Sequence, residues 1–371
     1  MALVINEEQQ MLKNSAKEFL KEKAPVEALR KLRDSKDPKG YDPSLWASMS
    51  EMGWAALTIP VAYGGLGFGY TGLGQVLEES GRTLTASPLV STALFGATLI
   101  NLAGTEKQKN TLLPAIGDGQ LLVSVAFEES NAHKPFSVQT SYSAKNGSYT
   151  IQGSKKFVLD GNVANHFVVS ATGEESDLAL FLVDGQTAGI SIEQTPMMDS
   201  RSAVTVTFNN VEAEMLGAAK EGKKVLGKAL DIARIGLAAE MLGSMQEAFD
   251  RTVSYLKERQ QFGVPIGVFQ GLQHRAADMY CEIEICKSLV LKSLQSIDED
   301  SPKLPALASM TKAKVGEVLK LVTNEGIQMF GGIGMTDDEE IGFFMKRARV
   351  AQRTFGDTNY HLNRFASLNG F

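Results

Sequence analysis

Residues 255–279 read YLKERQQFGVPIGVFQGLQHRAADM. Within this stretch Arg259 and Phe262 precede a Gly-Val-Pro break, and Gln270 follows where a second helical run begins. An arginine beside a backbone turn suits bidentate capture of a phosphate, and a phenylalanine and an amide just beyond it can pack against a nucleotide and hydrogen-bond to it. The same residues also suit a helix-loop-helix corner with a solvated arginine, because Arg, Gly and Pro all occur in ordinary loops. Residue chemistry alone leaves both interpretations open.

Around this stretch the chain divides into three regions of different pattern. From Asn6, which with Gln9 forms a capping-box pattern, apolar residues recur at helical spacing to about residue 119. Short apolar or alternating runs separated by Gly, Asn and Asp come next and are typical of an antiparallel sheet or small barrel. Long helical runs then return. The pattern predicts an α+β protein with an N-terminal helical domain (1–120), a middle β domain (121–217) and a C-terminal helical bundle (218–371).

The composition limits the class of protein. A chain of 371 residues with 43% hydrophobic content can bury a large core and divide into two or three domains. A net charge of -6 without a basic run argues against a nucleic-acid surface. Cys281 and Cys286 are spaced neither as a zinc pair nor as a redox Cys-x-x-Cys, so we expect buried thiols in a reducing compartment. Without an apolar signal at the N-terminus or a run of about 18 apolar residues, we expect a cytoplasmic protein that does not insert into a membrane.

Neither a Rossmann loop nor a metal site is indicated. Residues 67–72 fit G-x-G-x-x-G, but that pattern needs a strand before it and an acid about 20 residues on. Here the surroundings are helical, and the nearest acids, Glu78 and Glu79, come too soon. The four histidines lie far apart without acid or cysteine companions at ligand spacing, so we expect no metal.

As a whole, residues 255–279 resemble the signature of the acyl-CoA dehydrogenase family. Further matches come in the family's order and cover nearly the whole chain: PVAYGGLG (60–67), EESGR (78–82), GTEKQKNTLLP (104–114), NNVEAEMLG (209–217) and EGIQMFGGIGM (325–335). The chain is most similar to the small subunits of paired enzymes such as pimeloyl-CoA dehydrogenase. This resemblance implies a helical domain, a β-barrel domain and a four-helix bundle, in that order.

The resemblance also implies an FAD cofactor. In the family, the segments that match Arg259 and Gln328 contact the diphosphate and adenine end of an FAD held mainly by a neighbouring subunit. The positions of this chain that match the adenine side of the site are Arg259, Phe262, Phe269, Gln270, Gln328, Gly331, Gly332 and Thr358. The implied reaction removes the α-proton of an acyl-CoA thioester with a carboxylate base while the β-hydrogen leaves as hydride to the flavin. The implied electron acceptor is an electron-transfer flavoprotein.

Neither of the two places where the family carries its base holds an acid here. Gly356, in RTFGDTNYHLNRFA, stands at the first place, and Ala233, in LDIAR, stands at the second. Two nearby carboxylates are candidates for a relocated base, Glu240 and Asp357.

Each candidate base also has a structural interpretation. Glu240 lies two helical turns after Ala233, about 10 Å along the helix axis. A lone acid on the apolar stripe of Leu237 and Met241 would be partly desolvated. Desolvation raises the pKa of a carboxyl group, which favours a base. Glu240 could equally be a hydrogen-bonded core acid or a subunit contact. Asp357, next to Gly356, is also an ordinary N-cap for a terminal helix.

The residues that match the family's flavin-ring platform are altered. The family's Thr-Glu-Pro turn and Trp-x-Thr strand supply backbone and hydroxyl contacts to the ring. Glu128 and Leu159 stand where the two threonines are expected, and Phe157 replaces the tryptophan. Phe157 can still shield a ring face, but it has no indole N–H.

The two halves of the implied cofactor site disagree, which leaves three functions open. The leading hypothesis is an acyl-CoA dehydrogenase-type oxidoreductase in a heteromeric dimer of dimers, where this chain completes the FAD site of a sister subunit that carries the base. The alternatives are a homo-oligomeric dehydrogenase with a relocated base, and an assembly subunit without flavin. The pimeloyl-type resemblance points to dicarboxylyl, cyclic or bulky acyl-CoAs, by analogy of fold and pairing only.

Overall fold

The computed structural model describes residues 3–145, 147–173 and 177–371. The chain divides into two compact units. The helical unit combines Met1–Lys31, Tyr70–Thr85 and Arg234–Phe371, and the barrel unit combines Leu32–Gly69 and Ala86–Ala233. The three-domain division expected from the sequence remains a prediction, because these two units are defined by compactness and each combines segments from distant parts of the chain.

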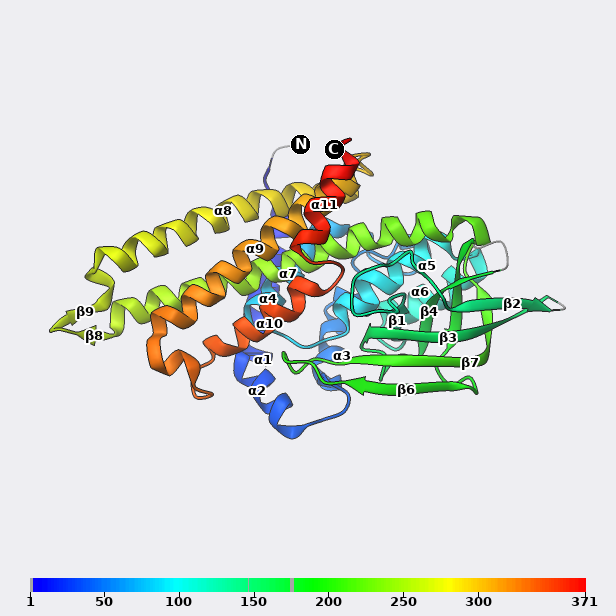
Figure 1. The fold of residues 1–371 in the computed structure, drawn as a ribbon, viewed down its shortest axis with the longest axis horizontal. Coiled ribbons are helices and arrows are strands. Elements are labelled where there is room, and N and C mark those ends of the chain that lie inside the picture. Colours follow the sequence, from blue (N-terminus) through cyan, green and yellow to red (C-terminus); the bar gives the residue numbers. More distant parts are fainter. Residues whose placement is uncertain (1–2, 146, 174–176) are drawn as a thin grey trace. The chain divides into compact units, whose positions relative to one another are not determined.

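Figure 1 shows the order of helices and strands. The helices are α1 (Glu7–Lys23), α2 (Val26–Ser35), α3 (Pro43–Glu51), α4 (Tyr70–Arg82), the π-helix η3 (Leu89–Gly96), α5 (Ala97–Ala103), α6 (Glu106–Gly117), α7 (Gly222–Glu258), α8 (Gln270–Asp298), α9 (Leu304–Phe330), α10 (Ile341–Arg353) and α11 (Thr358–Leu368). The short 3-10 turns are η1 (Trp54–Ala56), η2 (Val61–Tyr63), η4 (Ala219–Glu221), η5 (Ile266–Val268) and η6 (Gly331–Met335). The strands are β1 (Val123–Ala126), β2 (Ser141–Lys145), β3 (Ser148–Leu159), β4 (His166–Thr172), β5 (Leu178–Asp184), β6 (Ile190–Thr195), β7 (Ala203–Met215), β8 (Gln260–Gln261) and β9 (Val264–Pro265).

The sheet of the barrel unit closes on itself. Strands β4, β2, β3, β7 and β5 pair in that order, and β5 pairs again with β4. The predicted barrel and α+β class are confirmed, but the sheet is not wholly antiparallel, because β1 pairs with β4 in parallel and so does β2 through Ser141 and Thr172. Parallel pairing needs a connection of a dozen or more residues, and the hairpin β2–β3 supplies it between β1 and β4.

The apolar runs of the β region form its central strands. Their inward residues, among them Phe167, Phe181 and Phe208, are fully buried in one core. Strands β2 and β6 carry mostly exposed residues and are not part of any apolar run, so the sequence pattern did not reveal them. β6 pairs only with β7, at an edge where a polar strand is tolerated.

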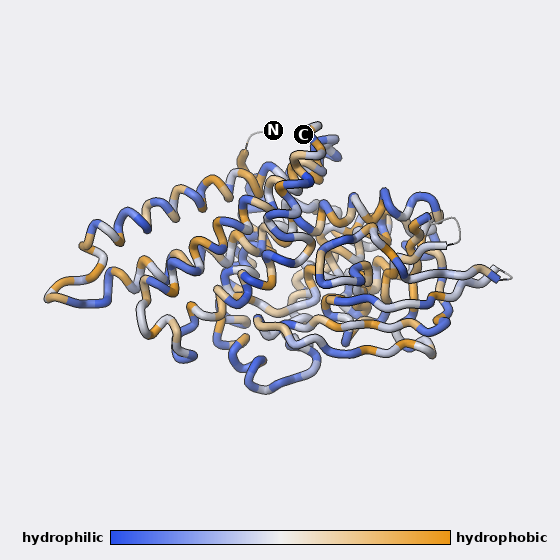
Figure 2. The backbone as a smooth tube through the Cα atoms, in the orientation of Figure 1, coloured by the Kyte–Doolittle hydropathy of each residue, from blue (hydrophilic) through white to orange (hydrophobic). Residues whose placement is uncertain are grey.

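Helix α9 lies at the centre of the helical unit, where it packs against α8, α10 and α11. Figure 2 shows hydrophobic and hydrophilic residues alternating along α8 and α9, as expected for helices with one buried side. Helix α7 is different, because residues 229–246 are buried without interruption. The single apolar stripe predicted for this helix is therefore too narrow, since a helix surrounded by others buries every face.

Helices α4 and α7 cross at backbone contact within the helical unit. A Cβ atom on Gly81 would lie 1.9 Å from the carbonyl oxygen of Glu240, and one on Gly243 would lie 1.7 Å from that of Glu78. No side chain fits at either position. Gly81 belongs to the EESGR motif, so close helix packing explains that part of the motif.

The two cysteines differ in exposure. Cys286 is buried on α8, and burial raises its pKa to about 12, which keeps the thiol protonated. Cys281 is exposed, so the expectation that both thiols are buried is wrong for it. Five residues turn a helix by about 140°, which points the two side chains in different directions.

None of the helices in the described part of the chain has the length and apolarity that crossing a lipid bilayer requires.

Candidate functional site

The Arg259 segment forms a short hairpin, β8–β9, at the end of α7. Arg259, Phe262, Phe269 and Gln270 are all exposed, and Phe262 is 90% exposed with a left-handed backbone (φ 56°). Its ring meets that of Phe269 edge to face at 6.1 Å. Phe262 and Gly263 (φ 80°) form the two-residue turn of this hairpin, in which both residues need a positive φ, so the hairpin itself explains the backbone of Phe262.

The Gln328 segment lies at the same end of the helical unit. The ring of Tyr255, near the end of α7, stacks on that of Phe330, at the end of α9, with centroids 4.3 Å apart. Gln328, Gly331 and Gly332 beside it are exposed, and a Cβ atom on either glycine would meet open space. The structure therefore brings together two groups of residues that the sequence placed about 60 positions apart.

Thr358 stands apart from these two groups. It begins α11 and lies near Gly316, where a Cβ atom would be 3.3 Å from the Thr358 Oγ1 atom. From Gly316 to Gln328 along α9 is roughly 18 Å. One extended dinucleotide could contact both places, but the structure does not gather Thr358 with the others.

The Arg259 guanidinium at this end of the helical unit suits an anion. Within the described part of the chain, Arg259 forms no ion pair, so its guanidinium is available. The neighbouring Arg275, in contrast, is paired with Glu325. The cation, the exposed aromatic rings and the open glycine backbone fit the diphosphate and adenine part of FAD.

Gly356 has a backbone that opposes an acidic side chain at this position. It is buried with φ 106°, and Phe355 before it also has a positive φ of 61°. An L-residue with a side chain is strained at such angles. Ala233, at the other base position, is fully buried in α7.

Glu240 is not the lone acid expected from the sequence. Its carboxylate pairs with Arg347 of α10, with Nε to Oε1 at 3.0 Å and Nη2 to Oε2 at 3.1 Å. Both side chains are buried. Arg347 lies 107 positions away, so no local pattern could have indicated this partner. A bidentate guanidinium occupies both carboxylate oxygens and leaves them poorly placed to take a substrate proton.

Asp357 caps helix α11. Its carboxylate accepts a hydrogen bond from the Tyr360 backbone N–H at 2.9 Å, with extended backbone angles typical of an N-cap. Both candidate bases thus have the structural roles that the sequence left open for them.

The ring-side residues lie in the barrel unit. Phe157 is 39% exposed and left-handed (φ 51°), and it falls where the β3–β7 register shifts between Lys155 and Val158. Such bulges re-aim side chains next to functional sites. Phe157 is thus partly exposed at a bulge, and its role in shielding a flavin ring stays a prediction.

The polar contacts expected for a flavin ring are absent from the residues that replace the two threonines. Glu128 contacts the Nδ1 atom of His133 and accepts from the Lys134 N–H at 3.2 Å, so its oxygens are engaged. Leu159 has no polar side-chain atom. The diphosphate-side residues therefore fit FAD, whereas Glu128 and Leu159 do not reproduce the hydroxyl contacts.

Next to Glu128, the Glu129 carboxylate forms a buried ion pair. It accepts from Lys155 Nζ at 2.7 Å and from the backbone N–H groups of Gln139 and Thr140. Lys155 is fully buried, and its pKa falls to about 8 because burial outweighs the pull of Glu129. The pKa of Glu129 is lowered, since Lys155 and the N–H donors overcome its own desolvation.

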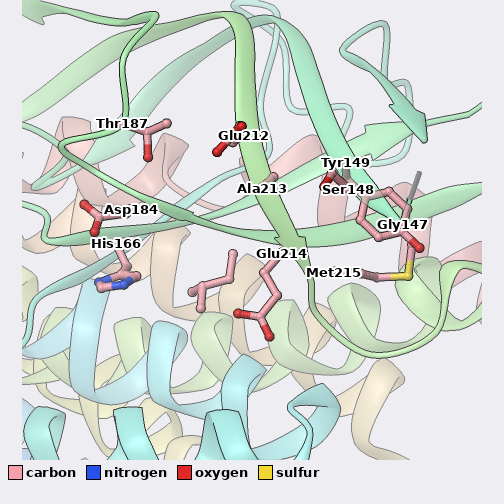
Figure 3. A pocket seen from close by; sticks show the side chains of 11 residues that line it. Gly147, Ser148, Tyr149, His166, Asp184, Thr187, Glu212, Ala213, Glu214 and Met215 are labelled. Carbon is pink, nitrogen blue, oxygen red and sulfur yellow. The ribbon is translucent and has the colours of Figure 1, made fainter. Parts of the chain in front are cut away.

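A cavity of about 390 Å³ opens elsewhere in the barrel unit (Figure 3). Its lining includes His166, Asp184, Glu212 and Glu214. Burial lowers the pKa of His166 although Asp184 opposes this, which favours the neutral imidazole. Asp184, Glu212 and Glu214 repel phosphates and the described residues of the lining include no Lys or Arg, so this cavity does not suit FAD or CoA. The described residues also contain no cluster of His, Cys, Asp and Glu that could hold a metal.

Sequence reasoning missed two buried cations near the first base position. Arg234 of α7 and Lys312 of α9 are each 1% exposed and bond to the loop that carries Gly356. No local signal marked Lys312, because Lys314, Glu317 and Lys320 lie on the same helical stretch and make it one of several charged residues there.

Comparison with known proteins agrees with this architecture. Models of the N-terminal, middle and C-terminal domains of acyl-CoA dehydrogenase match residues 6–120, 128–211 and 220–367. The short/branched chain specific acyl-CoA dehydrogenase of Bos taurus mitochondria is 32% identical over 97% of this chain and 85% of that protein.

Solved structures agree as well. A variant of the Tcur3481-Tcur3483 steroid ACAD has a TM-score of 0.90 at 31% identity, with 98% of each chain covered. A structure described as the electron transferring flavoprotein of Acidaminococcus fermentans has a TM-score of 0.93 at 29% identity over the whole of both chains. Three domain matches in order and a relative this similar over nearly the whole length identify the chain as a member of the acyl-CoA dehydrogenase family of FAD-dependent oxidoreductases.

Proposed function

We propose that this chain is one subunit of a heteromeric acyl-CoA dehydrogenase, a dimer of dimers. Its exposed Arg259 and Gln328 segments complete the diphosphate and adenine end of an FAD held mainly by a sister subunit. The sister subunit carries the carboxylate base. Sites for acyl-CoA oxidation are then shared between unlike chains, as suggested by the resemblance to pimeloyl-type small subunits.

One observation carries this proposal: the residues for chemistry are lost or engaged while the residues for a neighbour's cofactor stay available. Gly356 and Ala233 offer no carboxylate, and Glu240 and Asp357 bond within the chain. Arg259, by contrast, is exposed beside exposed aromatic rings. A chain that held its own active FAD would also need a free carboxylate base and the hydroxyl contacts to the flavin ring.

Two related structures add support through their descriptions. One is described by two component names, Tcur3481-Tcur3483, and as a steroid ACAD. The other is described as an electron transferring flavoprotein. By analogy with them, the substrate is a bulky acyl-CoA and the electron acceptor is an electron-transfer flavoprotein.

The test is an Arg259→Ala substitution in the complex purified with its sister subunit. Loss of charge-assisted hydrogen bonds of about 1.5–3 kcal/mol should weaken FAD binding roughly 10- to 150-fold. The measurement is flavin absorbance per complex after dilution and gel filtration. Lys257→Ala, which removes an exposed cation two residues earlier, is the matched control and should keep its flavin. Wild-type flavin occupancy in the Arg259→Ala complex would contradict the proposal.

A further inference from the structure

The loop between α10 and α11 is held by buried cations. Lys312 Nζ donates to the carbonyl oxygens of Ala351 at 2.9 Å, Gln352 at 3.0 Å and Gly356 at 3.1 Å. The first two are carbonyls at the C-terminal end of α10, which have no partner within the helix. The third belongs to the loop itself. One ammonium therefore joins the end of a helix to the loop that follows it.

Arg234 holds the same loop from α7. Its Nε atom donates to the Phe355 carbonyl oxygen at 3.0 Å, and its guanidinium lies over the Tyr360 ring, 5.5 Å from the centroid. His361 Nε2 lies 3.1 Å from the same carbonyl oxygen. The positive φ angles of Phe355 and Gly356 turn these carbonyls inward, toward the cations.

One face of α9 supports the loop at successive turns. Ser309 Oγ accepts from Arg364 at 2.8 Å, Lys312 binds the three carbonyls, and the Gly316 carbonyl accepts from Gln352 Nε2 at 2.5 Å. Gly316 also leaves room for the Thr358 hydroxyl. The place of Thr358, the first residue of α11, thus follows from contacts that α9 makes with the loop.

We propose that Lys312 and Arg234 are positioning residues, which fix the loop of residues 355–358 and so set the place of the Thr358 hydroxyl, a position that matches an FAD contact of the family. The inference rests on the proposed function for its FAD part only. The contacts of Lys312 and Arg234 with the loop, called the clamp below, lie within this chain and do not depend on the proposed function.

The clamp depends on the protonation of Lys312. An ammonium has three N–H donors for three carbonyls, whereas a neutral amine has two. Burial lowers the pKa of Lys312 to about 7, with Arg234 and Arg347 acting in the same direction and Asp357 against it. Glu240, the other buried acid nearby, is already paired with Arg347. Below this pKa all three bonds form, and as the pH rises through it one carbonyl loses its donor.

The experiment is amide hydrogen exchange of residues 354–361 between pH 6 and pH 9, with each rate divided by its intrinsic value at that pH. For the wild-type chain, protection should fall roughly threefold to tenfold as the pH rises through about 7. Lys312→Met should lower protection at every pH and flatten the profile. Lys320→Met, an exposed position on the same helix, is the matched control and should follow the wild type. The wild-type profile needs no substitution, so a poorly folding variant cannot leave the question open.

Flavin content of the complex with the sister subunit separates the two parts of the inference. If loop protection responds to neither pH nor Lys312→Met, the clamp is overturned. If the loop loosens and flavin is lost in Lys312→Met, both parts are supported. If the loop loosens but flavin is kept, while Arg259→Ala loses it, the positioning of Thr358 is overturned and the proposed function stands. If flavin survives both substitutions, the proposed function fails and only the clamp remains.

Discussion

At the scale of the residue, the Glu240–Arg347 pair is the feature with the largest expected energetic effect. Two charges buried between α7 and α10 are tolerated because each neutralises the other in a bidentate geometry. Removing one partner leaves a buried charge with no counter-ion. We therefore expect Glu240→Gln to lower the free energy of unfolding by about 3–5 kcal/mol, measured by denaturant titration.

A double substitution separates a structural role of Glu240 from a catalytic one. Glu240→Leu combined with Arg347→Met removes both charges, and such apolar replacements are nearly neutral or stabilising. The double variant should regain most of the lost stability. Full stability of Glu240→Gln together with loss of acyl-CoA oxidation would instead identify Glu240 as the base.

At the scale of the element, the Glu129–Lys155 pair ties the connection after β1 to strand β3. Glu129→Gln would leave a buried ammonium unpaired, whereas Lys155→Met would leave Glu129 with two backbone donors. We expect Glu129→Gln to be the more destabilising of the two. The difference in unfolding free energy between wild type and Glu129→Gln should be largest at mildly acidic pH, where Lys155 is charged in both proteins, and should shrink as the pH rises to 8, because without Glu129 the buried ammonium loses its proton at a lower pH. A difference that grows over this range would show that the ion pair is not its cause.

Helix α4 depends on a cap from a distant element. The Asp298 carboxylate, at the end of α8, accepts from the backbone N–H groups of Tyr70 at 2.7 Å and Thr71 at 2.9 Å. It also accepts from the Thr71 hydroxyl at 2.6 Å. Loss of such a cap costs about 1–2 kcal/mol, so Asp298→Ala should lower the unfolding free energy by that amount.

The control for the cap is Glu299→Ala, which removes only a 3.6 Å surface pair with Lys292 and should change stability by less than about 1 kcal/mol. Equal effects of the two substitutions in thermal unfolding would mean that the α4 cap contributes nothing specific.

At the scale of the whole molecule, the proposed sharing of sites determines the flavin stoichiometry. The chain purified alone should carry little FAD, because the ring side lacks the threonine hydroxyls and only the neighbour's half of a site is presented. The complex with the sister subunit should carry one FAD per pair of unlike chains. Visible absorbance against protein concentration, with the mass of the complex from light scattering, measures both quantities. Near one FAD per chain in the isolated protein would favour a homo-oligomeric enzyme.

The sequence by itself determined the features that depend on neighbours within one or two turns. The Asn6–Gln9 capping box and the Asp357 cap form as predicted, because donor and acceptor are only three residues apart. The central strands follow their apolar runs, and the family motifs gave the architecture and the FAD cofactor. Hydrophobic periodicity and short-range hydrogen bonds depend on residues that are close in sequence, so such features can be predicted without a structure.

Only the tertiary structure decided which distant groups meet. Glu240 lies 107 positions from Arg347, Asp298 lies more than 220 positions from the helix it caps, and Lys312 reaches carbonyls some 40 positions on. A buried charge must find a partner, but its own sequence context does not say which one, because the choice depends on how helices cross and where loops return. For the same reason the sequence suggested Glu240 as a candidate base, whereas in the folded protein its carboxylate pairs with Arg347.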